Sequence, residues 1–159
     1  MDVKATVQQA LGYYELGLFS EADALLETVV SGEPLVEFQH LRILVKIDRG
    51  EWELANAFAV EAISHFPERA FGYIQRAYVL HELGRTAEAA AVLGAAPDDS
   101  KDSVEDVIHY NLACYLAQTG QLDAALEKLK EALTFNTALI EDAREDVDLE
   151  PIREQIDLL

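Results

Sequence analysis

Cysteine, basic side chains and long apolar runs are all scarce in this sequence. Cys114 is the one cysteine among 159 residues, which excludes an intramolecular disulfide and a zinc site built from several cysteines. The longest uncharged run of small and apolar residues, 89–96, is far shorter than the roughly 20 residues of a membrane-spanning helix. The first residues also lack the basic start and apolar core of a secretory signal. We therefore expect a protein of the reducing cytoplasm.

Positively charged residues are also few in this sequence. The chain has 12 Lys and Arg against 30 Asp and Glu, a formal net charge of −18. Such a field repels nucleic acid and anionic membrane surfaces, so we expect neither as a partner. A basic or apolar protein segment is accommodated more easily. The alternative, that the charge only keeps a helical surface soluble, stays open.

Patterns that carry catalysis or metal binding are scarce as well. No phosphate-binding glycine loop and no nucleophile elbow occurs in the sequence. No two of the four histidines are spaced to share one helix face, and Cys114 falls in a stretch predicted to be buried or to face a groove. We therefore expect no enzymatic activity, no cofactor and no metal site.

A pattern of glycine and alanine recurs four times along the chain. The glycines are 33, 34 and 36 residues apart, and each is followed five residues later by alanine. Glycine ends a helix because it adopts the left-handed conformation without strain, and alanine lets the next helix approach closely. The pattern therefore predicts a series of helical hairpins. Its glycine and alanine pairs are Gly17 with Ala22, Gly50 with Ala55, Gly84 with Ala89, and Gly120 with Ala125.

Apolar residues at helical spacing between these marks predict eight helices. Their expected bounds are 3–16, 20–31, 36–49, 53–65, 70–83, 87–95, 104–119 and 123–135. Pro34 and Pro67 are expected to stop the second helices of the first two hairpins. In the third hairpin a short second helix and a loop over 98–103 are expected, with Ser103 as the N-cap of the next helix. Lys46 and Arg49 occupy positions where the pattern expects apolar residues.

The chain resembles tetratricopeptide-repeat (TPR) proteins over about residues 3–137. The resemblance is strongest from Tyr110 through the turn at Gly120 to Leu133, and the segment 143–153 is similar to the tail of small bacterial members. It implies an all-α, right-handed α-solenoid in one domain, 1–159. The implied parts are repeats at about 3–35, 36–69, 70–103 and 104–137, and a C-terminal capping segment at 138–159.

In this family the first helices of the hairpins line a concave groove that receives partners. By position, the resemblance places six apolar or aromatic side chains in that groove: Leu11, Tyr14, Leu44, Ile74, Tyr78 and Tyr110. Glu15, Asp48 and Glu82 each lie two residues before a turn glycine and would form an acidic ladder for Lys or Arg of a partner. The alternatives are packing between hairpins, cover by the C-terminal segment or a second subunit, and simple solvation of the acidic helix ends.

We therefore expect a non-catalytic module that binds a peptide segment or a protein surface in its groove, for example as an assembly scaffold. Two other functions stay open, a small acidic secretion or assembly chaperone and a self-associating structural protein, which would be a homo-oligomer. Family members that bind acidic chaperone tails use basic residues at fixed groove positions. None of the residues at those positions is cationic here, so that ligand class is not expected. The residues concerned are Val7, Leu11, Leu41, Phe71 and Gln75.

Overall fold

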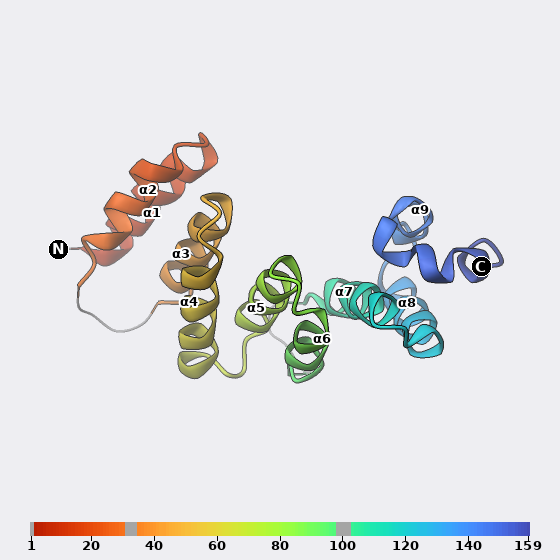
Figure 1. Ribbon diagram of the computed structural model, residues 1–159. Helices are drawn as coiled ribbons and strands as arrows, with labels where there is room; N and C mark the ends of the chain where they lie inside the picture. Colours follow the sequence, from red (N-terminus) through yellow and green to blue (C-terminus); the bar gives the residue numbers. More distant parts are fainter. Residues whose placement is uncertain (1, 31–34, 98–102) are drawn as a thin grey trace. The chain divides into compact units, whose positions relative to one another are not determined.

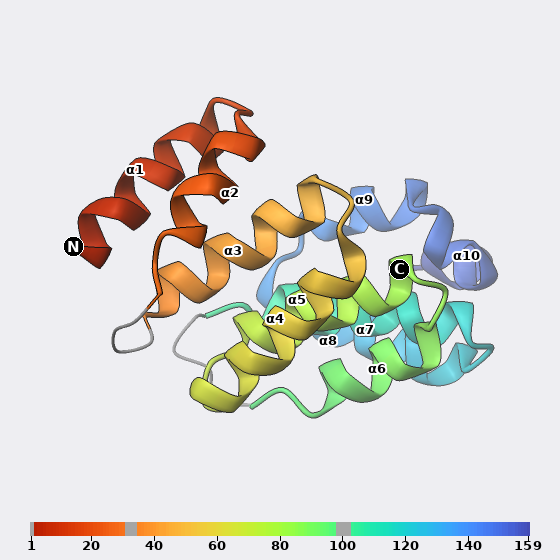
Figure 2. The ribbon, with the colours of Figure 1, turned by 60° about the vertical axis from the view of Figure 1, so that its left-hand side comes forward.

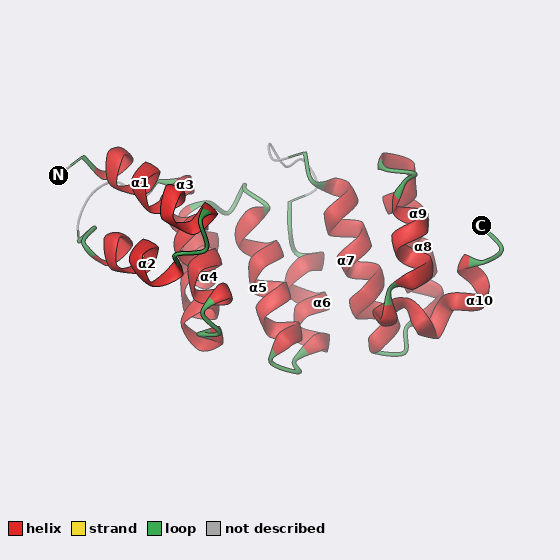
Figure 3. Ribbon diagram, turned by 90° about the horizontal axis from the view of Figure 1, so that it is seen from above, coloured by secondary structure: helices red, strands yellow, loops and turns green. Residues whose placement is uncertain are grey.

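The computed structural model describes residues 2–30, 35–97 and 103–159, and in these ranges every regular element is helical (Figure 3). The elements in chain order are α1 (Val3–Glu15), α2 (Phe19–Glu27), α3 (Val36–Asp48), α4 (Trp52–His65), α5 (Phe71–Glu82), α6 (Thr86–Gly94), α7 (Glu105–Gln118), α8 (Leu122–Phe135), α9 (Leu139–Glu145), the 3₁₀ helix η1 (Val147–Ile152) and α10 (Arg153–Ile156). No strand occurs in the described ranges, and the predicted all-α class is confirmed.

Seven of the eight predicted helices begin and end within one residue of their expected bounds. The exception is α2, which was predicted to reach residue 31 and ends at Glu27. Thr28, Val29 and Val30 follow, and β-branched side chains restrict the rotamers available in a helix, so three in a row favour its end. Residues 31–34, with the predicted stop at Pro34, lie outside the described ranges.

The four predicted turn glycines all adopt the left-handed conformation, with φ between 70° and 80°. The same two hydrogen bonds close every turn. The glycine N–H donates to the carbonyl three residues back, and the next N–H donates to the carbonyl five residues back, as in Gly17 to Tyr14 and Leu18 to Tyr13, both 2.9 Å. This pattern satisfies carbonyls that the helix end would leave unpaired. The alanine five residues after each glycine is fully buried, at 0% exposure in all four hairpins.

The chain divides into two compact units, Met1–Pro67 and Glu68–Leu159. Unit 1 holds α1 to α4 (Figure 2), and its core joins α1, α2 and α3 through residues such as Val7, Ala22 and Val45. Unit 2 holds α5 to α10 (Figure 1), and its core includes Leu112 and Leu129. The boundary lies close to the predicted end of the second repeat. The single domain over 1–159 stays a prediction.

An ionic cluster between α2 and α3 explains the two charged residues in the second hairpin. The Lys46 ammonium donates to the Asp23 carboxylate at 2.7 Å, and these residues are only 5% and 7% exposed. Burial lowers the pKa of Lys46, but the hydrogen bonds and charges of Asp23 and Glu51 together outweigh it, so the net shift is upward. Arg49 pairs with Glu51 and donates to the Ser20 hydroxyl at 2.8 Å. Paired charges therefore replace the expected apolar contact without shifting the helix.

The third hairpin has the short second helix that was predicted, α6, with nine residues. The predicted N-cap at Ser103 is wrong, because the N-cap residue of α7 is Val104 and no side chain caps it. Ser103 has φ 50°, a left-handed conformation, whereas an N-cap residue normally has extended backbone. The rest of the predicted loop, 98–102, lies outside the described residues.

Alanine substitutions of Gly12 and Gly17 are expected to move the free energy of unfolding in opposite directions. A Cβ at Gly12, inside α1, would meet nothing within 4 Å, so Gly12→Ala should stabilise the chain by about 0.5–1 kcal/mol. Gly17 has φ +74°, so Gly17→Ala should destabilise it by about 1–2 kcal/mol. Urea unfolding measures both. A stabilising Gly17→Ala would contradict the role given to the turn.

Lys46→Met should destabilise the fold by about 3 kcal/mol, because it leaves the buried Asp23 carboxylate without its main partner. The loss is near the lower end for a broken buried pair, since Arg49 Nε lies 3.4 Å from Asp23. Replacing both charges, with Asp23→Leu added, should recover most of the loss. The control is Lys128→Met, whose more exposed pair with Glu131 is expected to contribute less than about 1 kcal/mol. Equal losses for the two lysines in thermal unfolding would contradict the assignment.

Candidate functional site

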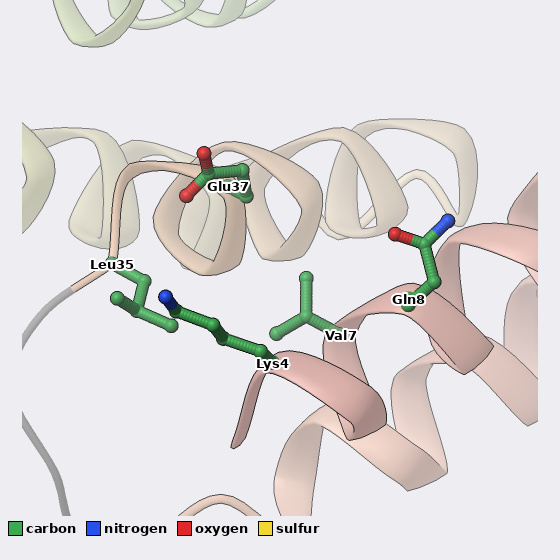
Figure 4. Close-up of a pocket in the computed structure, with 5 residues that line it drawn as sticks. All are labelled: Lys4, Val7, Gln8, Leu35 and Glu37. Carbon is green, nitrogen blue, oxygen red and sulfur yellow. The ribbon is translucent and has the colours of Figure 1, made fainter. Parts of the chain in front are cut away.

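Two adjoining cavities lie between the first helices of unit 1, α1 and α3. One has a volume of about 260 Å³ and the other about 200 Å³. Figure 4 shows the larger, with Val7 between the helices and the Lys4 side chain extending toward Leu35. Val7 and Glu37 line both cavities, so the two form one groove, named here the α1–α3 groove. Its lining residues are Lys4, Val7, Gln8, Leu11, Leu35, Glu37, His40, Leu41 and Leu44.

Aliphatic side chains form most of the wall of this groove. Leu11 from α1 and Leu44 from α3, both predicted groove residues, line the same cavity and are partly exposed. Val7 and Leu41 lie deeper and belong to the core of unit 1. Val7 and His40 are four residues before Leu11 and Leu44, so helical spacing alone was enough to place them on the same faces. The smaller cavity is therefore mostly apolar, whereas Lys4, Gln8 and Glu37 make the wall of the larger one mixed.

A tyrosine and a carboxylate join the C-terminal ends of α1 and α3. The Tyr14 hydroxyl donates to Asp48 at 2.6 Å, which brings two more predicted residues together. Burial, then the hydrogen bond and charge of Asp48, raise the pKa of Tyr14 to about 12. Glu15 follows Tyr14 and is exposed. Among the described residues no cation lies within ion-pair distance of Glu15 or Asp48, so this end of unit 1 carries two uncompensated carboxylates.

In unit 2 the C-terminal segment covers one face of α7. The Tyr110 hydroxyl donates to Asp146 at 2.9 Å, and Gln118 Nε2 donates to the backbone carbonyl of Asp148 at 2.8 Å. Leu149 of η1 is 0% exposed, so apolar burial holds the segment as well. The helix α9, with η1 and α10 after it, forms the short helix and capping segment that the resemblance implied. Tyr110, predicted to face a partner, thus contacts the chain's own tail.

The same contact gathers a cysteine and two carboxylates that the sequence analysis missed. Ligand atoms of Cys114, Asp146 and Asp148 lie within 4.8 Å of one another, a donor set that could approach a metal ion. Burial, followed by the charge of Asp146, raises the pKa of the Cys114 thiol far above its usual range, which makes the free thiol a poor nucleophile. Asp146 already accepts from the Tyr110 hydroxyl and the Asp148 N–H, and His81 Nε2 lies 3.4 Å from Asp148. These contacts bind the C-terminal tail to the rest of unit 2.

More than thirty residues separate Cys114 from the two aspartates in the chain, so no local sequence pattern could predict this cluster.

The remaining predicted residues lie on α5 of unit 2. Ile74 is partly buried against the core of that unit, and Tyr78 is 38% exposed. Glu82, the last residue of α5, is exposed. Of the predicted acidic ladder, Glu15 and Asp48 therefore share unit 1, while Glu82 belongs to unit 2. The role of all nine predicted residues in partner binding stays a prediction.

Several solved structures share this architecture. The structure of PilF from Pseudomonas aeruginosa superposes with a TM-score of 0.81 at 19% identity, covering 97% of this chain and 69% of that one. A thermophilic TPR protein from Thermus thermophilus gives a TM-score of 0.70 at 24% identity, covering 100% and 83%. A structure of MamA from AMB-1 gives 0.71 at 20% identity, covering 86% and 80%. The chain has a tetratricopeptide-repeat fold. No family model and no curated protein matches this TPR chain.

At these identities the similarity establishes the TPR fold alone, and the implied resemblance is confirmed at that level. The described part of this TPR chain has no helix with the length and apolar content needed to cross a membrane.

The rate at which Cys114 reacts with a thiol reagent should show whether the C-terminal segment covers α7. In the wild-type chain the buried thiol, with its raised pKa, should react slowly with a disulfide reagent such as DTNB. Leu149→Ala removes a fully buried side chain, at a cost of about 2–5 kcal/mol, and should speed the reaction at least tenfold by opening the tail. The control Leu158→Ala changes a side chain that is 86% exposed and should leave the rate unchanged. Fast reaction in the wild type would contradict the described cover.

Proposed function

We propose that this TPR chain is a non-catalytic protein-interaction module that binds a segment of a partner protein through the first helices of its hairpins. The observation that carries the proposal is the α1–α3 groove, in which a mostly aliphatic cavity adjoins a larger one of mixed character. An apolar surface of this kind suits an extended segment or one face of an amphipathic helix. We propose that all nine predicted residues support binding. The five in unit 1, and Ile74, Tyr78 and Glu82 on α5, do so by direct contact. Tyr110 does so by holding the tail.

The hairpin frame supports a binding function because it needs little rearrangement to present the groove. Each turn is closed by two backbone hydrogen bonds and each helix pair by a fully buried alanine. Binding to a preformed surface avoids part of the ordering cost that a flexible site would pay. Leu11 and Leu44 are partly exposed without a partner and would be covered in the complex, which adds roughly 25 cal/mol for each Å² of apolar surface buried.

The polar groups at the groove favour binding over catalysis. Lys4, Gln8 and Glu37 line the larger cavity, which opens to solvent and does not enclose an acid and a base in a pocket. The one thiol is buried beneath the tail in unit 2. The net charge of −18 favours a protein partner, basic or apolar, over nucleic acid or an anionic membrane. A role as a cytoplasmic assembly scaffold is the form of this function that we favour.

A random peptide library displayed on phage and selected on the full chain should test the module directly. We expect enrichment of peptides with paired aliphatic residues. Leu44→Asp should weaken their binding at least tenfold in titration calorimetry, because it places a charge in the apolar wall. Leu54→Asp is the matched control, since Leu54 is 46% exposed on α4, away from the groove, and should leave affinity unchanged.

Circular dichroism of both variants confirms that each is folded. Peptides that bind Leu44→Asp as tightly as the wild type would remove the groove as the site. A chain that enriches no peptide and elutes as a stable oligomer would favour the self-associating alternative instead.

A further inference from the structure

The tail on α7 provides an internal example of a segment bound to a first helix. The tail contacts three side chains of α7, Tyr110, Cys114 and Gln118. These residues lie ten, six and two positions before the turn glycine, Gly120. At the last of these positions Gln118 donates to a backbone carbonyl of the segment at 2.8 Å. Two aspartates of the segment, Asp146 and Asp148, contact this face, so α7 is adapted to an acidic, carbonyl-presenting ligand.

Unit 1 carries different chemistry at the equivalent positions. The residues ten, six and two before the turn glycine are Val7, Leu11 and Glu15 on α1, and His40, Leu44 and Asp48 on α3. The middle position is aliphatic on both helices. The last position, which on α7 is the donor Gln118, is a carboxylate that only accepts hydrogen bonds. A segment with the chemistry of the tail would be repelled there, whereas a cationic side chain would be attracted.

The carboxylates at this end keep their charge available to a ligand. Tyr14 occupies one oxygen of Asp48 and leaves the other, and Glu15 is exposed. The described cations on α3 are already paired elsewhere, Arg42 with Glu61 and Lys46 with Asp23. Lys4 stands about 16 Å away, near the other end of α1, since eleven residues of helix separate it from Glu15. Glu37 lines the same cavity as Lys4, so that end carries both signs of charge, whereas the end with Glu15 and Asp48 carries negative charge alone among the described groove residues. This difference gives the groove an electrostatic direction.

We propose that the α1–α3 groove selects partner segments in which an aliphatic pair is followed by lysine or arginine. The aliphatic side chains occupy the two cavities, and the cation lies between Glu15 and Asp48. The volume of each cavity is several times the roughly 30 Å³ that one water molecule occupies in the liquid. Each cavity can therefore hold a whole aliphatic side chain. The charge sets the direction and register of the segment more than its overall affinity. This inference rests on the proposed function and adds the class of partner.

The test uses fluorescein-labelled synthetic peptide pools with two leucines at i and i+3 or i+4, followed by lysine, glutamine or glutamate. Fluorescence anisotropy with the full chain measures each pool. The lysine pool should bind roughly two- to fivefold more tightly than the glutamine pool for each carboxylate engaged, and the glutamate pool least. The advantage of lysine should shrink as salt is added, because exposed charges are screened.

Variants assign the preference to the acidic end. Glu15→Gln should remove most of the advantage of the lysine pool, and Glu15→Lys should reverse the order of the lysine and glutamate pools. Glu53→Gln is the matched control, because it makes the same change in net charge at an exposed position on α4 of the same unit and should leave the ratio unchanged.

The outcomes separate this inference from the function on which it rests. Equal binding of the three pools, all weakened by Leu44→Asp, would overturn the cation selection and leave the apolar groove as the site. A lysine preference that Glu53→Gln reduces as much as Glu15→Gln would overturn it too, since the general negative field would then explain the effect. Failure of every pool to bind would overturn both proposals.

Discussion

The left-handed glycine turn is the constraint on which the rest of this molecule depends. It reverses the chain within a few residues, and the fully buried alanine five residues later brings the second helix against the first. Because all four hairpins share this geometry, residues at the same distance from their glycine occupy equivalent places on the first helices. Differences in chemistry between hairpins can therefore be compared position by position.

That comparison distinguishes the two units. On α7 the equivalent row holds Tyr110, Cys114 and Gln118, and the chain's own tail covers it with hydrogen bonds and buried aliphatic residues. On α1 and α3 the row is aliphatic in the middle and acidic at the end, and it borders a groove. The same hairpin geometry thus presents one surface, on α7, that the chain's own tail covers, and another, on α1 and α3, that suits a partner. The difference lies in a few side chains and leaves the helices unchanged.

Two polar pairs link the helices of unit 1, one buried and one at an exposed helix end. Asp23 and Lys46 meet between α2 and α3, and Tyr14 and Asp48 join the ends of α1 and α3. Each pair links helices that are consecutive in unit 1 or one helix apart, so it fixes their register where apolar packing would tolerate sliding. Removing Lys46 is costly because the Asp23 carboxylate stays buried, whereas Asp48 is exposed and its pairing with Tyr14 contributes less. The hairpins are therefore held together by specific contacts as well as by apolar burial.

The sequence alone determined the helices, the turns and the repeat, because these depend on local spacing, on the backbone freedom of glycine and on the size of alanine. It failed at Thr28–Val30, where β-branched residues end α2 early, and at Ser103, whose backbone conformation no local pattern reveals. The family resemblance placed Leu11, Leu44, Tyr14 and Asp48 on the first helices, and the structure brings Leu11 near Leu44 and Tyr14 to Asp48. Only the tertiary structure decided that Lys46 pairs with Asp23 and that Asp146 accepts a hydrogen bond from Tyr110. These contacts join residues far apart in the chain, and their partners are selected by packing in three dimensions, which periodicity along a sequence does not encode.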